Sequence, residues 1–421
     1  MRTIALVLVL SLAAAATHAD DYASNRQRVV RTPGLVAFWD FVKREPEGLH
    51  RFTAHVPEGS PTDYPLDAAN YVKDCWGEGR DATYDDFPLL GRGPFGQAIR
   101  IRKEEDATFR PMLLVPRSRL HGTPLDIKGG GRSVSVVVWA IRESGTHALA
   151  GIWHEGVDLK HASNADAVKG APGQRQYALF AGLNKGGSAC GHVSENGRGS
   201  FLNKYALHKC NSVPRSPEVA GDSPAGVLDA SWQTFAMTFD DGRDELTGWL
   251  DGVAGERWLD DPKKAGLLSY AYNAYMQGHY HRIPGTQPDE DETFPPDQYY
   301  NPPEEELLAM EVTRQNPTER VERRDYRNTR VEVTLAKNKR GVWTETSRDL
   351  VALRLNPWWY PHGIYAPEDA TTGGPFTIGR VIHNGRSVGF TGWIGGVAVY
   401  DRALTADELA ALSACAEPPS Q

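Results

Sequence analysis

Aromatic, histidine and arginine side chains gather in the second half of the chain, and these are the residues whose types could do chemistry. Planar rings stack on the faces of sugars, and arginine binds a carboxylate or a sulfate through two hydrogen bonds. These residue types therefore favour recognition of a carbohydrate, and of an acidic polysaccharide in particular. The residues that we expect to bind it are Tyr280, His281, Trp359, His362, Arg380 and His383.

Some of the same side chains could catalyse a reaction. In an elimination, a cation neutralises the carboxylate of a uronic acid while Tyr or His transfers the proton. The candidate catalytic residues are Tyr280, His281 and His383. Binding without catalysis, and a segment that merely folds, remain open as alternatives.

Two other kinds of site have less support in the sequence. His279 and His281 would lie on one face of a strand, but two imidazoles without a third ligand do not define a metal site. The acidic runs 289–292 and 304–306 lie in a loop and at a helix start, where solvation explains them. A laminarinase-type glucanase instead directs alternate carboxylates of a Glu-x-Asp-x-x-Glu strand into its cleft, and the sequence contains no such strand.

Composition and the N-terminus predict an exported protein. The chain has 421 residues and a formal net charge of −8, with no concentrated basic stripe, which argues against a nucleic-acid partner. Residues 1–19 read as a secretory signal peptide, with Arg2, an apolar run and Ala19 at the expected cleavage site. No second apolar stretch is long enough to span a membrane. We therefore expect an extracellular or periplasmic location.

The chain has four cysteines, an even number that permits disulfides in an oxidising compartment. Cys190 and Cys210 bracket a loop rich in Gly and Asn, so we expect these two to form a disulfide. The pairing of Cys75 and Cys415 remains open.

Short segments with strand patterns recur along both ends of the chain. The clearest are 133–142, which is almost entirely apolar, and 232–240, which alternates. The dipeptide Asp251-Gly252 after 246–250 predicts a tight hairpin turn. Further strands are expected at 35–41, 97–102, 147–154, 176–183, 376–380 and 392–400.

This pattern breaks between about residues 269 and 370, which we interpret as a large mixed insertion between two of these strands, at the rim of the fold that they form. Asn301, the prolines after it and three glutamates predict a helix that runs to about Arg314. Alternation over 330–335 predicts a strand. A long insertion in a loop costs little closure entropy.

The most specific stretch is near the C-terminus, where a strand and a turn precede a short helix capped by Thr405 and Glu408. It reads Gly392-Trp-Ile-Gly-Gly-Val-Ala-Val-Tyr-Asp-Arg-Ala-Leu-Thr405. This resembles the closing strand of laminin G-like domains in the concanavalin A-like jelly-roll superfamily, Gly-x-Ile-Asp-Glu-Val-x-Ile-Tyr-Asn-Arg-Ala-Leu-Ser. Segments 35–41, 133–142 and 231–258 are also similar to that family.

The resemblance implies an all-β jelly-roll sandwich with a short C-terminal helix. We expect the sandwich to comprise 20–268 and 371–415, the insertion 269–370, and a tail 416–421. The family's function implies a secreted, lectin-like protein; the alternatives are a polysaccharide lyase, favoured over a hydrolase, and a cell-surface adhesion or structural module. Calcium is the family's usual ion, but Gly395 and Gly396 replace its acidic pair.

Overall fold

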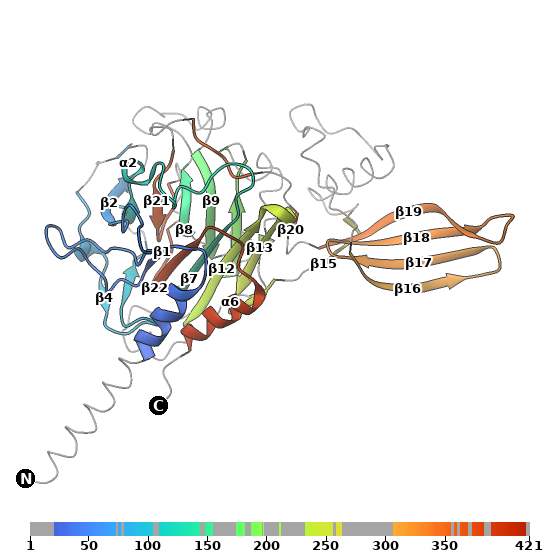
Figure 1. The fold of residues 1–421 in the computed structure, drawn as a ribbon, viewed down its shortest axis with the longest axis horizontal. Coiled ribbons are helices and arrows are strands. Elements are labelled where there is room, and N and C mark those ends of the chain that lie inside the picture. The colour runs from blue at the N-terminus through green and yellow to red at the C-terminus, as the bar shows by residue number, and fades with distance from the viewer. Residues whose placement is uncertain are drawn as a thin grey trace, which may run out of the picture.

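The computed structural model contains a two-sheet β-sandwich and a separate antiparallel sheet that projects from it (Figure 1). The residues that the structure describes are 21–72, 75–76, 80–103, 109–143, 148–154, 174–181, 187–195, 197, 210–211, 232–255, 258–262, 306–354, 358–359, 363–368, 373–382 and 389–417.

The first sheet has nine strands in the order β14-β13-β12-β7-β22-β5-β4, with β1 also paired to β22 and β20 to β13. Its strands are β1 (Leu35–Trp39), β4 (Leu89–Leu90), β5 (Ala98–Ile101), β7 (Val134–Arg142), β12 (Gln233–Asp240), β13 (Glu245–Leu250), β14 (Val253–Ala254), β20 (Trp358–Trp359) and β22 (Gly392–Tyr400). The closing strand β22 therefore lies beside N-terminal strands, as the sequence predicts.

The second sheet has eight strands in the order β11-β10-β9-β8-β21-β6-β2-β3. They are β2 (Asp67–Val72), β3 (Cys75–Trp76), β6 (Pro111–Val115), β8 (Ala148–His154), β9 (Gln174–Ala181), β10 (Ala189–Val193), β11 (Cys210–Asn211) and β21 (Phe376–Ile378). All the pairings in both sheets are antiparallel.

The main core lies between these two sheets. Val136 and Val138 of β7 belong to one buried cluster with Leu179 of β9 and Ile378 of β21. Apolar residues at every second position explain this arrangement, because side chains alternate between the two faces of a strand. The predicted all-β sandwich is therefore confirmed.

Helices cover the outer face of the first sheet. Residues 21–31 form a helix that the sequence pattern did not predict, and α6 (Ala406–Ser413) is the predicted C-terminal helix. Trp139 of β7 lies in the same cluster as Leu412 and donates its indole N–H to the Leu412 carbonyl at 3.0 Å. The remaining helices are short: η1 (Tyr84–Asp86), α2 (Arg117–Leu120), η4 (Asp241–Arg243) and η9 (Ala414–Ala416).

The two glycines of β22 have a packing role. A Cβ at Gly395 would lie 2.5 Å from Cδ of Pro94, and one at Gly396 would lie 2.6 Å from a ring carbon of Phe95. Real Cβ atoms essentially never come this close to another heavy atom. The loop that holds Pro94 and Phe95 thus leaves no space for a side chain at Gly395 or Gly396.

The third sheet is the projecting one, with the order β15-β19-β18-β17-β16. Its strands are β15 (Trp258–Asp260), β16 (Leu307–Gln315), β17 (Glu319–Tyr326), β18 (Thr329–Lys337) and β19 (Trp343–Arg354). We call β16 to β19, residues 307–354, the arm. The strand predicted at 330–335 is confirmed, whereas the bounds 269–370 of the insertion remain a prediction.

The helix predicted from Asn301 to Arg314 is wrong over its second half, which forms β16. Local capping and charge signals favoured a helix, but pairing with β17 decides the structure. Propensity is a weak prior that tertiary contacts override.

The predicted disulfide between Cys190 and Cys210 is also wrong, because Cys190 is a buried thiol. The backbone register pairs Cys190 with Asn211 and Gly191 with Cys210, so the two cysteines are offset by one residue. Such an offset exchanges the two faces of a strand.

Candidate functional site

An open groove of about 720 Å³ lies over strands β2 and β6 of the second sheet. On β6, Leu113 and Val115 face the main core, whereas Leu114 between them lies on the other face and lines the groove. The groove is lined by Leu49, Asp67, Ala68, Ala69, Ala82, Thr83, Tyr84, Leu114, Pro116, Arg117 and Pro375. A concave, largely apolar surface of this size with a few polar groups is typical of a ligand site.

Tyr84 and Asp67 supply polar atoms to this lining. The hydroxyl of Tyr84, at the start of η1, donates to the Leu66 carbonyl at 2.6 Å, which fixes the ring. Asp67 accepts from Arg51 at 3.0 Å and pairs with Arg119 at 2.7 Å. Asp67 is therefore shared between two arginines at the edge of the groove.

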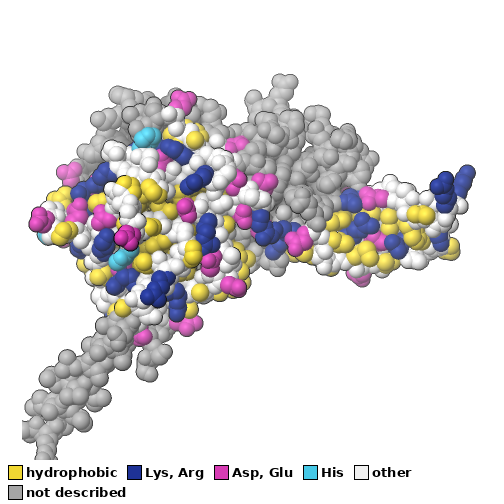
Figure 2. All heavy atoms as spheres, viewed as in Figure 1, with side chains coloured by type: hydrophobic (Ala, Val, Ile, Leu, Met, Phe, Trp, Pro, Cys, Tyr) yellow, Lys and Arg dark blue, Asp and Glu magenta, His cyan; other side chains and the backbone are white. Residues whose placement is uncertain are grey.

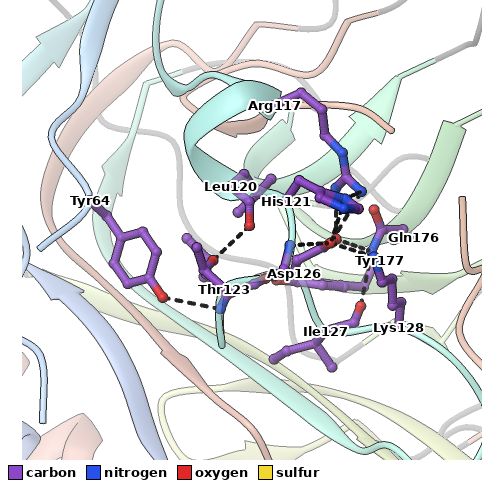
Figure 3. A network of polar contacts seen from close by, with 12 residues as sticks. Tyr64, Arg117, Leu120, His121, Thr123, Asp126, Ile127, Lys128, Gln176 and Tyr177 are labelled. Atoms are coloured by element: carbon purple, nitrogen blue, oxygen red, sulfur yellow. Dashed lines mark hydrogen bonds and ion pairs between the residues drawn. The ribbon is translucent and has the colours of Figure 1, made fainter. Parts of the chain in front are cut away.

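Behind the groove, Arg117 takes part in a polar network that Figure 3 shows from close by. Arg117, at the start of α2, donates to both oxygens of Asp126 at 2.7 and 3.1 Å. The Asp126 carboxylate is fully buried and also accepts from Lys128 at 2.6 Å. Gln176 of β9 donates to the same carboxylate at 3.3 Å and to the Ile127 carbonyl at 3.0 Å.

The cations of this network keep the buried Asp126 carboxyl in its ionised form. Burial favours the neutral form of Asp126, but hydrogen bonds and charge from Arg117 and Lys128 outweigh it and lower the pKa of this carboxyl. Asp126 is thus ionised at neutral pH, and one negative charge faces two positive ones. His121, which is exposed, lies beside Arg117, with its Nδ1 3.1 Å from Nη2.

The residues predicted from the sequence to bind the ligand are mostly outside the described residues. This holds for Tyr280, His281, His362 and His383. The backbone of Trp359 pairs with Glu245 at the edge of the first sheet. Arg380 follows β21, and its side chain is 3 % exposed. Recognition by this set remains a prediction.

Sequence reasoning did not find the groove. Its lining comes from segments around residues 49, 67, 83, 116 and 375, which share no motif. The segment Pro116-Arg-Ser-Arg-Leu120, before a polar turn, was a sequence signal for two of the cations, Arg117 and Arg119.

Calcium does not fit the places that the family resemblance suggests. Gly395 and Gly396 carry no side-chain oxygen, and a Cβ at either position would meet Pro94 or Phe95. The carboxylate of Asp40 is already held by Arg26 at 2.9 Å and by His55 at 2.8 Å. Within the described ranges, no group of three or more His, Cys, Asp or Glu could hold a metal ion. In the same ranges, no helix is long and apolar enough to cross a membrane.

Comparisons with known proteins give distant structural likenesses only. No protein-family model matches the chain, and no curated protein matches its sequence. Among solved structures, one match is domain 4 of AbnA, a GH43 extracellular arabinanase from Geobacillus stearothermophilus, in complex with arabinotriose. That match has a TM-score of 0.35 and 9 % identity, and covers 90 % of this chain and 98 % of that one.

Two further matches are to parts of larger chains. A structure of botulinum neurotoxin type C, whose cell entry depends on interaction with two ganglioside molecules, matches with a TM-score of 0.33 and 7 % identity over 93 % of this chain and 53 % of that one. Trypanosoma rangeli sialidase with the inhibitor DANA matches with a TM-score of 0.33 and 11 % identity, over 96 % and 38 %. This chain thus spans about half or less of those two chains. Likeness at this level assigns neither a ligand nor an activity to this protein.

Proposed function

We propose that this is a secreted protein that binds an acidic polysaccharide in the groove over β2 and β6. The observation that carries the proposal is the charge around the groove. Four cations there, Arg51, Arg117, Arg119 and Lys128, share three carboxylates, those of Glu45, Asp67 and Asp126. These ion pairs together carry one positive charge in excess, in a chain whose net charge is −8.

This local excess can act on a ligand although the whole protein is acidic. Exposed charges are screened beyond about 10 Å at ordinary salt, so groups at the groove outweigh distant ones. The half-buried Tyr84 ring offers a surface for the C–H face of a sugar, while Thr83 and Asp67 can hydrogen-bond its hydroxyl groups. The arginines then favour a carboxylate or sulfate on the same ligand.

The geometry favours binding over catalysis by Tyr84. Burial, followed by the negative charge of Asp67, raises the pKa of Tyr84 to about 12. A phenol with that pKa stays protonated at neutral pH and is a poor general base. The lyase alternative would require a different proton acceptor.

Filling the groove tests the proposal. Ala82 lines the groove from a loop and is half buried, so Ala82→Trp should occupy the space without disturbing either sheet. Isothermal titration with polygalacturonate as the acidic probe and laminarin as the neutral one should show binding of polygalacturonate by the wild type and its loss in the variant. The matched control is Glu58→Trp, at an exposed turn that does not line the groove.

Equal binding by wild type and Ala82→Trp would place the ligand elsewhere and reject the groove. Tighter binding of laminarin than of polygalacturonate would reject an acidic ligand. Unsaturated product, detected by its ultraviolet absorbance after incubation with polygalacturonate, would favour the lyase over the binding protein.

A further inference from the structure

The arm differs from the rest of the chain in charge. Residues 307–354 contain 11 Lys and Arg against 7 Asp and Glu, a net charge of +4. The whole chain has a net charge of −8, which leaves −12 for the residues outside the arm. Cations are therefore concentrated on the one sheet that projects from the sandwich (Figure 1).

The tip of the arm, residues 337–343, comprises the turn between β18 and β19 and the strand residue on each side of it. Lys339 and Arg340 are exposed there, and neither forms an ion pair with another described residue. By contrast, Arg314 and Arg330, elsewhere on the arm, pair with carboxylates at 2.7 and 2.6 Å. Figure 2 shows Lys and Arg side chains at the far end of the arm, with no acidic side chain visible beside them.

Hydrogen bonds hold the tip in one shape. The side-chain oxygen of Asn338 accepts from the backbone N–H groups of Arg340 at 2.9 Å and Val342 at 3.0 Å. The backbone of Asn338 also accepts from Gly341 at 2.9 Å, and Gly341 has a φ of 79°, which glycine adopts without strain. Lys339 and Arg340 therefore lie on an ordered turn, so less conformational entropy is lost when they bind a partner.

Apolar side chains accompany these cations. Val342 at the tip is 57 % exposed, and Trp343 next to it is half buried, with the Lys337 ammonium 5.4 Å from its ring. Of the ten exposed large hydrophobic side chains among the described residues, five lie on the arm. The other four arm residues are Leu307, Leu308, Met310 and Val312, all on the edge strand β16.

We propose that the tip of the arm docks on an anionic phospholipid surface. Basic residues are attracted to acidic headgroups, and a valine beside a tryptophan gains from the boundary between headgroups and acyl chains. A soluble polyanion would form ion pairs with Lys339 and Arg340 but would leave the Val342 side chain exposed to water. The exposed apolar tip therefore favours a lipid surface over an acidic polysaccharide.

The length of the arm reduces the electrostatic repulsion between the acidic sandwich and an anionic surface. β18 has nine residues and therefore extends about 30 Å. This is about three times the distance of about 10 Å over which salt screens a charge. The acidic sandwich is thus held far enough from the surface for its repulsion to be screened while the tip makes contact.

Co-sedimentation of the full chain with vesicles tests this proposal. Vesicles of phosphatidylcholine that also contain phosphatidylglycerol should bind the protein, whereas phosphatidylcholine alone should not. Each cation near an acidic surface contributes a factor of about five, so Lys339→Gln with Arg340→Gln should reduce partitioning roughly 30-fold. Val342→Ser should reduce it severalfold without any change in charge.

The matched control removes the same charge from the sandwich. Arg92 and Lys103 are exposed there, and Arg92→Gln with Lys103→Gln should leave vesicle binding nearly unchanged. An equal loss in control and tip variants would overturn the proposal, as would equal binding to both kinds of vesicle. So would binding of soluble heparin that depends on Lys339 and Arg340 but not on Val342, without binding to vesicles.

Discussion

Arg117 and Asp126 form a two-pronged ion pair at the base of the groove, with Nη1–Oδ1 and Nη2–Oδ2 distances of 2.7 and 3.1 Å. Because the carboxylate is fully buried, Asp126→Asn would leave Arg117 and Lys128 without a counter-charge. We expect a loss of about 3–5 kcal/mol in the free energy of unfolding, measured by urea denaturation. Asp85→Asn, an exposed carboxylate in η1, serves as the control and should change little.

The same pair makes a prediction about acid. The pKa of Asp126 is lower in the folded protein than in the unfolded chain, whose value is about 4. Its contribution is therefore complete above about pH 4 and disappears as pH falls through the lower, folded value. Below about pH 4, the stability of Asp126→Asn should fall less steeply with pH than that of the wild type. Parallel curves for the two proteins would contradict this.

Side chains larger than glycine should destabilise the closing strand at Gly395 and Gly396. Gly396→Ala places a methyl group against Phe95, and overpacking of this kind costs about 1–3 kcal/mol. Gly395→Asp should cost more, because it also buries a charge beside Pro94 and Trp232. Thermal unfolding monitored by circular dichroism measures both. Gly91→Ala is the control, since a Cβ there meets no atom within 4 Å.

The C-terminal helix depends on its capping box. Thr405 accepts from the Glu408 N–H at 3.3 Å, and Glu408 accepts in return from the Thr405 N–H at 2.9 Å. Thr405→Ala should cost about 1 kcal/mol.

Hydrogen bonds from Arg402, partly opposed by burial, lower the pKa of Glu408 to about 2. The stabilisation by Glu408 should therefore be present above about pH 4.5 and be lost between that pH and about 2, whereas Glu408→Gln should show no such loss.

Charge at the edge of the groove should separate acidic from neutral ligands. Arg119 pairs with Asp67 and is partly exposed, so Arg119→Gln should disturb folding little. If the proposed function holds, affinity for polygalacturonate should fall severalfold and become less dependent on salt. Glu58→Gln, an exposed change of charge outside the groove, is the comparison. Identical salt dependence in wild type and Arg119→Gln would contradict a role for this cation.

The sandwich could be predicted from the sequence because its strands carry their own pattern. The apolar run of β7 and the Asp251-Gly252 turn, whose two residues both have positive φ, specify local structure directly. β16 shows the limit of this reasoning. Its helix signals were local, whereas its pairing with β17 requires a partner further along the chain.

The groove and its network could not be predicted for a related reason. Arg117 and Asp126 are nine residues apart and become partners only when the segment after α2 turns back and places Asp126 beside Gln176 of β9. Nothing in their spacing marks them as a pair. The aromatic and histidine residues were selected for their residue types. Composition carries no information about which side chains lie in contact in the folded protein.

The position of the last strands has a consequence for synthesis and export. β22 lies between β7 and β5 in one sheet, and β21 lies between β8 and β6 in the other. Until the final segment from Phe376 to Tyr400 has emerged, each sheet consists of two halves with unpaired inner edges. The sandwich therefore closes only after nearly the whole chain has been delivered. If the predicted signal peptide directs export, this delay keeps the chain open enough to pass through a translocation channel, while its unpaired edges are exposed to chaperones and to aggregation.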